Sequence, residues 1–272
     1  DDKRLIKSFT NAMPEGQEAQ WVRDFAFTLL KCRNLFDGFI LKRQFTTRVE
    51  EDEGDWSLQR LKKNVSNGKS TPGYAHVFRQ SEAVEESDPD SDTRNVLLLQ
   101  SMLRITYTAP RTMHWLTRTL QWLATHQRPE AVASSGLAHL LKGYARAKVA
   151  SAFFDAEVQP QEFGIARIVF TYLDYLLLNE KPNRNFKFQF RNSIEHFYPQ
   201  HPDKEQSGAP VSGDKRDLLG NLALVSVSAN SKFSNSLPKA KAENFKDTIE
   251  IQSPKLQRMA EITRSAGWDD EQ

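Results

Sequence analysis

The apolar residues of the N-terminal two thirds of the chain recur at helical spacing. Over residues 18–45 they fall three or four positions apart, which predicts one broken amphipathic helix or two consecutive ones. A weaker helix is predicted over residues 56–65, and the breaker-rich stretch SNGKSTPG then ends it. Four further helices are predicted over residues 93–108, 110–126, 128–154 and 161–180. We therefore expect residues 1–182 to form an α-helical domain.

The hydrophobic pattern then changes its period. From Phe186 to Phe190, phenylalanines alternate with polar residues, and this two-residue repeat predicts a half-buried strand. The apolar run NLALVSVS, over residues 221–228, predicts a second strand, and residues 229–237 predict a short helix that the following proline stops. We therefore expect a mainly α-helical protein in which residues 183–272 form a smaller domain of two strands and a helix.

Composition and charge narrow the functional classes only in part. A net charge of +2 is too small to prove a nucleic-acid partner. The acidic stretch SEAVEESDPDSD, over residues 81–92, is expected to be a solvated loop, so the remainder is more basic than the total suggests. The single cysteine, Cys32, excludes an internal disulfide and a cysteine-based zinc site. Because no long apolar run or secretory pattern is visible, we expect a cytoplasmic protein without a membrane partner.

Four polar residues occupy informative positions around the predicted strands. Glu195 and His196 end the first strand, Asn221 opens the second, and Asn230 follows nine residues later at the start of the helix. Hydrolysis of a phosphodiester needs a base to activate water and a divalent cation to neutralise the developing charge. A neutral imidazole suits the first task at about pH 7, and a carboxylate with an amide oxygen suits the second. These residues therefore point to a metal-dependent nuclease.

One geometrical condition must hold for this interpretation. Neighbouring residues of a regular strand point to opposite faces, so Glu195 and His196 can serve one site only if the backbone leaves regular β geometry there. Pro199, three residues after His196, favours such a departure.

The segments SIEHFYPQ and LLGNLALVSVSANSKFSNSLPKAK resemble the HNH, or His-Me finger, nuclease motif of GmrSD-type restriction proteins. The resemblance is tightest over residues 192–241, and the stretch NVLLLQSMLRITYTAPRTMHWL is similar to the helical region that precedes this nuclease. Such proteins are modification-dependent enzymes of phage defence that join a ParB-like nucleotidase domain to an HNH domain. The resemblance implies a ββα-metal fold, DNA as a partner, including modified phage DNA, and a nucleotidase or sensor domain or subunit that is not visible in this chain.

The same resemblance implies a role for each polar residue. His196 is the general base, and Glu195 and Asn230 coordinate a single Mg²⁺ or Mn²⁺. Asn221 tethers the loop that carries the histidine and so supports catalysis without binding the metal. The chain departs from many HNH proteins in carrying Glu in place of Asp at Glu195 and in having no cysteines near the motif. No structural zinc is therefore expected.

Several residues have alternative interpretations. Asn235 competes with Asn230 as the metal ligand. Asn221 follows a glycine and could be only a turn residue, whereas Asn230 could be only a helix N-cap. His201 lies in a proline-containing loop and is expected to be solvated.

Basic residues cluster on and around the motif helix. They could form a solvated face, but beside a nuclease motif they are expected to hold backbone phosphates without reading base sequence. These residues are Lys232, Lys239, Lys241 and Arg216.

The sequence is compatible with three functions. The first is a metal-dependent DNA endonuclease of a restriction or anti-phage system. The second is an inactive module that binds nucleic acid or a partner, although a decayed site would be expected to have lost at least one of the four polar residues. The third is an RNA-cleaving nuclease, because the motif contacts phosphate and metal and does not separate DNA from RNA.

Overall fold

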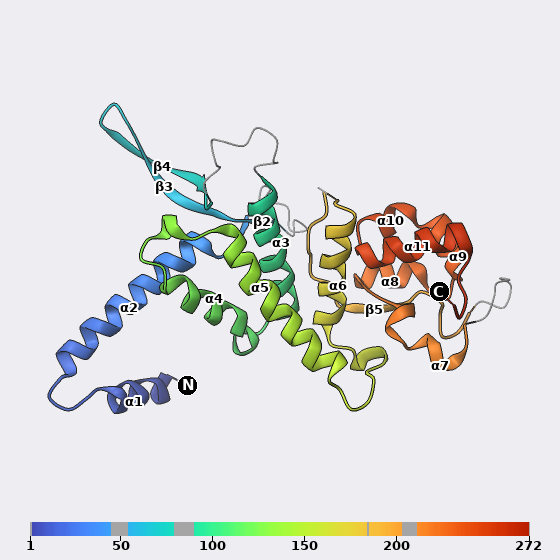
Figure 1. The fold of residues 1–272 in the computed structure, drawn as a ribbon, viewed down its shortest axis with the longest axis horizontal. Helices are drawn as coiled ribbons and strands as arrows, with labels where there is room; N and C mark the ends of the chain where they lie inside the picture. The colour runs from blue at the N-terminus through green and yellow to red at the C-terminus, as the bar shows by residue number, and fades with distance from the viewer. Residues whose placement is uncertain (1, 45–53, 79–89, 184, 203–210, 272) are drawn as a thin grey trace.

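The computed structural model of the chain describes residues 2–44, 54–78, 90–183, 185–202 and 211–271. Helices predominate, and the strands pair in separate two-stranded sheets (Figure 1). The longer helices are α1 (Asp2–Ala12), α2 (Glu18–Phe39), α3 (Asp90–Thr106), α4 (His114–Ala124), α5 (Ser134–Val149), α6 (Arg167–Glu180) and α11 (Pro254–Ala266). The shorter helices are α7 (Gly213–Arg216), α8 (Val227–Phe233), α9 (Pro238–Asn244) and α10 (Lys246–Glu250). The strands are β1 (Lys42–Gln44), β2 (Asp55–Ser57), β3 (Gln59–Ser66), β4 (Lys69–His76), β5 (Ser193–His196) and β6 (Leu222–Val225).

A β-hairpin replaces the helix expected over residues 56–65, so that prediction was wrong. Strand β3 pairs antiparallel with β4 in a register that sets Ser66 opposite Lys69. The two residues between them, Asn67 and Gly68, both have positive φ angles, of 49° and 73°. Asn-Gly is the preferred sequence for a two-residue hairpin turn with this geometry. The turn sequence therefore decides the local structure, and the sparse apolar pattern does not.

The four later helical predictions correspond to α3, α4, α5 and α6. Helices α4, α5 and α6 are shorter than expected, whereas α3 begins three residues earlier and ends two residues earlier than expected. Pro110 and Pro129 begin separate 3₁₀ turns that precede α4 and α5. At the N-terminal end, the chain leaves α2 at Phe39 and enters β1, so the expected helix does not reach residue 45. Of the acidic stretch expected to be a loop, residues 81–89 lie outside the described residues. None of the described helices is both long and apolar enough to cross a membrane.

One large hydrophobic core crosses the domain boundary expected near residue 182. It includes Leu99 of α3 and Leu137 of α5, and it also takes Phe186 and Phe188 from the segment before β5. These two phenylalanines are buried, whereas the lysine between them is exposed, as the alternating pattern predicts. Residues 186–192 nevertheless lie outside the regular strand, which begins at Ser193. Burial of alternate phenylalanines therefore does not require sheet pairing here.

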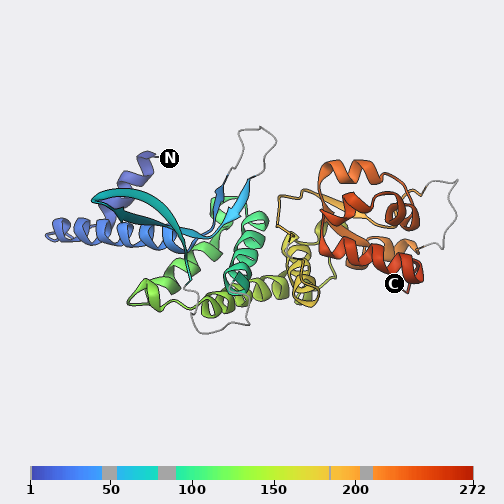
Figure 2. The ribbon, with the colours of Figure 1, turned by 90° about the horizontal axis from the view of Figure 1, so that it is seen from above.

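Strand β6 separates this large core from a second, smaller one. It pairs antiparallel with β5, with His196 opposite Leu222. Leu222 and Leu224 belong to the large core, whereas Ala223 and Val225 belong to the second core, which α8, α9 and α11 complete. A strand that is buried on both faces has a continuous apolar sequence, as this one does. Figures 1 and 2 show α6 between the N-terminal helices and the C-terminal group α8–α11.

The order β5, β6, α8 is the expected order of strand, strand and helix. Ser226 caps α8, because its hydroxyl accepts a hydrogen bond from the backbone N–H of Ala229 at 3.2 Å. The helix therefore begins at Val227 and not at residue 229, and Pro238 begins α9 where it was expected to stop a helix. That this segment is a ββα-metal fold stays a prediction.

A buried acid and a buried lysine join α6 to α11 and to the segment before β6. Asp174 accepts a hydrogen bond from the backbone N–H of Lys255 at 2.9 Å, in the first turn of α11. The Lys255 ammonium donates to the carbonyls of Leu219 at 2.7 Å and Gly220 at 3.1 Å, and also to that of Leu222. Burial raises the pKa of Asp174 to about 7 and lowers the pKa of Lys255 to about 7. The chain that enters β6 is thus held by a side chain from the first turn of α11.

Asp174→Asn is expected to flatten the pH dependence of the free energy of unfolding between about pH 4 and pH 7. The folded protein retains a proton on Asp174 over this window and the unfolded chain does not, so stability falls as pH rises toward 7. Burial lowers the pKa of Lys255 to about 7, so below that pH its ammonium is charged in both the folded and the unfolded protein. Lys255 therefore does not change how the free energy of unfolding depends on pH in this window. The loss in the unaltered protein is on the order of 2–4 kcal/mol.

Urea unfolding across this pH window measures the effect. The exposed Asp214 provides the matched control, and Asp214→Asn should keep the slope of the unaltered protein. An Asp174→Asn variant with an unchanged slope would contradict the assignment.

Candidate active site

A cavity of about 330 Å³ lies beside the end of β5. Glu195 and His196 both line it, although they are neighbours on a strand. The regular strand ends at His196, and the chain bends over Phe197 and Tyr198 before Pro199. The lining contains Glu162, Phe163, Ile194, Glu195, His196, Pro199, Gln200, His201, Asn230, Ser234 and Asn235. The structure therefore brings three of the four predicted residues, Glu195, His196 and Asn230, to one cavity.

The His196 ring is oriented by the carboxylate of Asp217. Its Nε2 lies 2.9 Å from Oδ1 of Asp217, and the His196 side chain is 11% exposed. The Gln200 amide donates to the same Asp217 oxygen at 3.2 Å and to Oε1 of Glu162 at 3.1 Å. In a neutral imidazole, a carboxylate that accepts from one ring nitrogen leaves the other nitrogen unprotonated. This arrangement suits a histidine that takes a proton through Nδ1.

Asn221 lies outside the cavity lining and ties the bend after β5 to the segment before β6. Its side-chain oxygen accepts from the backbone N–H of Tyr198 at 2.7 Å and from the Trp268 indole at 3.3 Å. Its amide donates to the carbonyls of Tyr198 at 2.9 Å and Arg216 at 3.0 Å. The side chain is buried and uses both its oxygen and its nitrogen, so Asn221 is more than a turn residue. These bonds fix the loop that follows His196.

Glu195 forms a buried ion pair with Lys241 of α9. The Lys241 ammonium lies 2.6 Å from Oε1 of Glu195, and the two side chains are 1% and 5% exposed, respectively. The ammonium also donates to the backbone carbonyls of His196 at 2.8 Å and Phe197 at 3.0 Å. Burial raises the pKa of Glu195 and lowers that of Lys241, and their mutual attraction opposes both shifts. Lys241 thus binds three consecutive residues at the end of β5.

The other predicted residues divide between the cavity and the surface. Asn230 lies in the middle of α8, where Ser226 is the N-cap, so the alternative of an N-cap role for Asn230 is wrong. Asn235 and His201 line the same cavity as Asn230, and His201 is exposed as expected. Asn235 therefore stays a competitor for the metal.

The predicted phosphate-binding residues are not equivalent. Lys232 and Lys239 are exposed, and their ammonium groups are accessible to a nucleic acid. Arg216 is half-buried, donates to the carbonyls of Val211 at 2.9 Å and Gln200 at 3.2 Å, and lies over the Tyr198 ring. The prediction that Lys241 binds phosphate was wrong, because its ammonium is buried against Glu195 and does not face a phosphate backbone.

The donors around the cavity fit a hard divalent cation. Glu195 uses Oε1 for Lys241, and a carboxylate has a second oxygen that can bind a metal. A separate group, Glu162, His196 and Asp217, offers one ligand atom each within 4.8 Å of one another. Carboxylate and amide oxygens are the ligands that suit Mg²⁺ and Mn²⁺, whereas an imidazole suits metals such as Zn²⁺ better. Both candidate ligand sets, Glu195 with Asn230 and Glu162 with His196 and Asp217, therefore lie around His196.

No clear signal in the sequence pointed to Glu162, Gln200 or Asp217. Glu162 precedes β5 by about thirty residues and reaches the site because its backbone N–H donates to the Asp217 carbonyl at 2.9 Å. Gln200 stood within the quoted motif, next to residues that had been assigned roles. Only the folded loop shows that these side chains converge on His196.

Comparison with known proteins places the C-terminal part of the chain in a family. Residues 146–272 match the family described as GmrSD restriction endonucleases, C-terminal domain. The match begins within α5 and contains α6, the β5–β6 hairpin and all the helices that follow. Neither curated proteins nor solved structures give a match to this chain. The family agrees with the one that the motif around His196 resembles.

Lys241→Met is expected to destabilise the protein by about 3–5 kcal/mol, because it leaves the Glu195 carboxylate buried without its cation. Lys239→Met, on the exposed side of the same helix, is the matched control and should change stability by less than about 0.5 kcal/mol. Urea unfolding of both variants measures the difference. Equal, small effects for the two variants would mean that the ion pair does not hold the end of β5.

Proposed function

We propose that this chain, whose residues 146–272 belong to the family of GmrSD restriction endonuclease C-terminal domains, is a metal-dependent nuclease that hydrolyses phosphodiester bonds of DNA. The observation that carries the proposal is the convergence of Glu195, His196 and Asn230 on one cavity, with Asp217 bound to the histidine ring. An imidazole beside oxygen donors for a cation is the combination that phosphodiester hydrolysis requires.

His196 is the general base in this proposal. Its Nε2 donates to Asp217, so the lone pair lies on Nδ1 and accepts the proton of the attacking water. Asp217 acts as a positioning residue, since it holds the tautomer and the ring orientation, and Gln200 holds Asp217 in turn. Asn221 fixes the loop behind the histidine and supports catalysis without touching the metal.

Glu195 and Asn230 would hold the single divalent ion, Mg²⁺ or Mn²⁺. When it is bound, the ion supplies Lewis acidity that neutralises charge on the phosphate and the leaving oxygen. Lys241 would position this metal ligand, because it binds the Glu195 carboxylate and the backbone carbonyls of the two residues that follow.

Lys232 and Lys239 would bind the phosphate backbone at the surface. Lys232 lies on the same helix as Asn230, but residues two positions apart point to different sides of a helix, so its phosphate contact would be separate from the metal ligand. Contacts to phosphate carry no sequence information, so selectivity must come from elsewhere. Restriction of modified phage DNA in the cytoplasm, with a nucleotidase or sensor domain as partner, is the biological role that we propose.

His196→Ala is expected to reduce DNA cleavage by roughly 10²–10⁴-fold, because it removes the base. His201 lines the same cavity and is exposed, so His201→Ala is the matched control and should cleave at nearly the unaltered rate. Initial rates of cleavage of a supercoiled plasmid in Mg²⁺ measure both. A folded His196→Ala variant that cleaves normally would exclude His196 as the base.

Asn230→Ala is expected to raise the concentration of Mg²⁺ or Mn²⁺ that gives half-maximal cleavage, because one ligand is lost. Asn235→Ala, which changes the competing amide in the same cavity, should leave that concentration unchanged. Cleavage rates over a metal titration separate the two. The opposite result, with only Asn235→Ala shifted, would assign the ligand to Asn235.

A further inference from the structure

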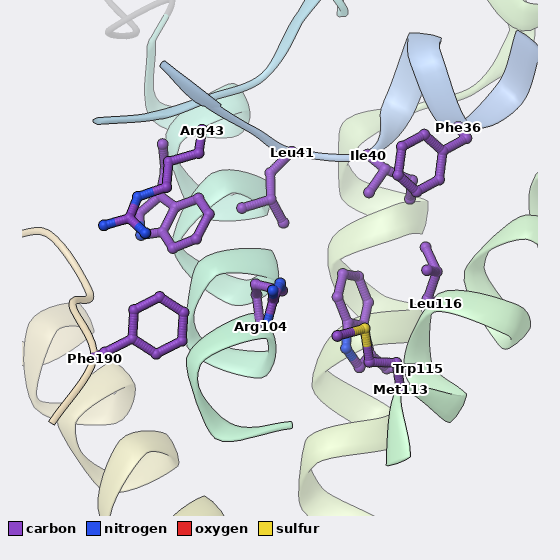
Figure 3. Close-up of a pocket in the computed structure, with 10 residues that line it drawn as sticks. Phe36, Ile40, Leu41, Arg43, Arg104, Met113, Trp115, Leu116 and Phe190 are labelled. Atoms are coloured by element: carbon purple, nitrogen blue, oxygen red, sulfur yellow. The ribbon is translucent and has the colours of Figure 1, made fainter. Parts of the chain in front are cut away.

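A second cavity, of about 230 Å³, lies among the N-terminal elements and does not share a lining residue with the His196 cavity (Figure 3). It is enclosed by the end of α2, strands β1 and β2, helix α3, the start of α4 and the segment before β5. Its lining consists of Phe36, Ile40, Leu41, Arg43, Trp56, Arg104, Met113, Trp115, Leu116 and Phe190. The walls are therefore apolar and aromatic, with two arginines and no carboxylate.

Two residues that line this cavity each carry a buried hydrogen-bond donor without a partner among the described residues. These donors are Nη1 of Arg104 and the indole Nε1 of Trp115, and Trp115 as a whole is 2% exposed. A buried polar atom without a hydrogen bond costs about 1–3 kcal/mol, and more when the group is charged. Native proteins keep few such atoms without a reason. Because both groups only donate, a ligand that satisfies them must offer acceptors.

The arginines also lie against the aromatic walls. The Arg43 guanidinium is 5.7 Å from the ring centroids of both Trp56 and Phe190, and the Arg104 guanidinium is 5.8 Å from that of Phe190. The Trp56 ring is itself fixed, because its indole N–H donates to the Phe188 carbonyl at 2.6 Å. Flat cationic and aromatic groups together favour a planar, electron-rich ligand.

We propose that this cavity binds a nucleobase with acceptors on one edge, as guanine has, supplied by a nucleotide or by the nucleic-acid substrate. Bases stack on aromatic rings and on guanidinium planes, and arginine donates to guanine O6 and N7. The volume lies below the roughly 300–1,000 Å³ of sites for drug-sized ligands, so one base fits better than several nucleotides. The inference rests on the proposed function only where the base belongs to the DNA that is cleaved.

The cavity is connected to the proposed active site through the chain itself. Phe190 lies three residues before Ser193, the first residue of β5, and β5 ends at His196. Trp56 is bonded to the same segment, at Phe188. Trp56 and Phe190 contact each other edge to face, with ring centroids 6.1 Å apart. A base that packs against this pair from the cavity would thus contact the segment that leads into the strand carrying the proposed general base.

Calorimetric titration of the full chain with dGMP, dAMP and inorganic phosphate tests the proposal without any need for cleavage. A guanine-containing single-stranded oligonucleotide, added to the His196→Ala variant, tests the polymer as the source. The test variants are Arg104→Met and Arg43→Met, and the control is Arg111→Met, which removes an exposed arginine of equal charge. Because Arg43 is exposed, its substitution is not expected to impair folding.

We expect dGMP or the oligonucleotide to bind, dGMP more tightly than dAMP, and each test variant to weaken binding at least about tenfold. Arg111→Met should retain the unaltered affinity. Binding of dGMP itself would identify a free nucleotide as sufficient, whereas binding of the oligonucleotide alone would identify the polymer. No binding to either, equal binding by all the variants, or inorganic phosphate competing as well as dGMP would overturn the proposal. If His196→Ala loses cleavage but no nucleotide binds to the chain, the proposed nuclease function is supported and the proposed nucleobase site is excluded.

Discussion

The buried ammonium of Lys241 is the interaction on which the candidate active site depends. It binds the Glu195 carboxylate and the next two backbone carbonyls, at the point where β5 ends. A regular strand would send Glu195 and His196 to opposite faces. Here the chain bends directly after them and both line one cavity. A buried charge of this kind is costly unless it is fully paired, which explains why one lysine makes three contacts.

Further buried hydrogen bonds hold the segments around this ion pair. Asn221 binds the bend on its other side, and Lys255 holds the carbonyls that precede β6. Strand β6 lies between two hydrophobic cores, so it cannot shift without disturbing both. The groups of the candidate active site therefore rest on buried elements, and the exposed Lys232 of α8 and Lys239 of α9 lie at the surface of the same unit.

The sequence predicted the order of strand, strand and helix, because the run from Leu222 to Val225 and the short helix after it have strong local patterns. The helix prediction over residues 56–65 was wrong, because apolar residues are few there and the Asn67–Gly68 turn decides the local structure. The sequence assigned Lys241 to the surface, because charge in a sequence does not reveal burial. Asp217 escaped notice for a related reason, since its contact with His196 exists only in the folded loop.

We propose that the residues around His196 hydrolyse DNA with the help of a divalent ion. Incubation of the unaltered chain with supercoiled plasmid in Mg²⁺, in Mn²⁺ and in EDTA tests it most directly. Nicked or linear plasmid is expected in at least one of the two metals, and intact plasmid in EDTA. Plasmid that stays intact in both metals, with protein that is folded and binds the DNA, would contradict the proposal.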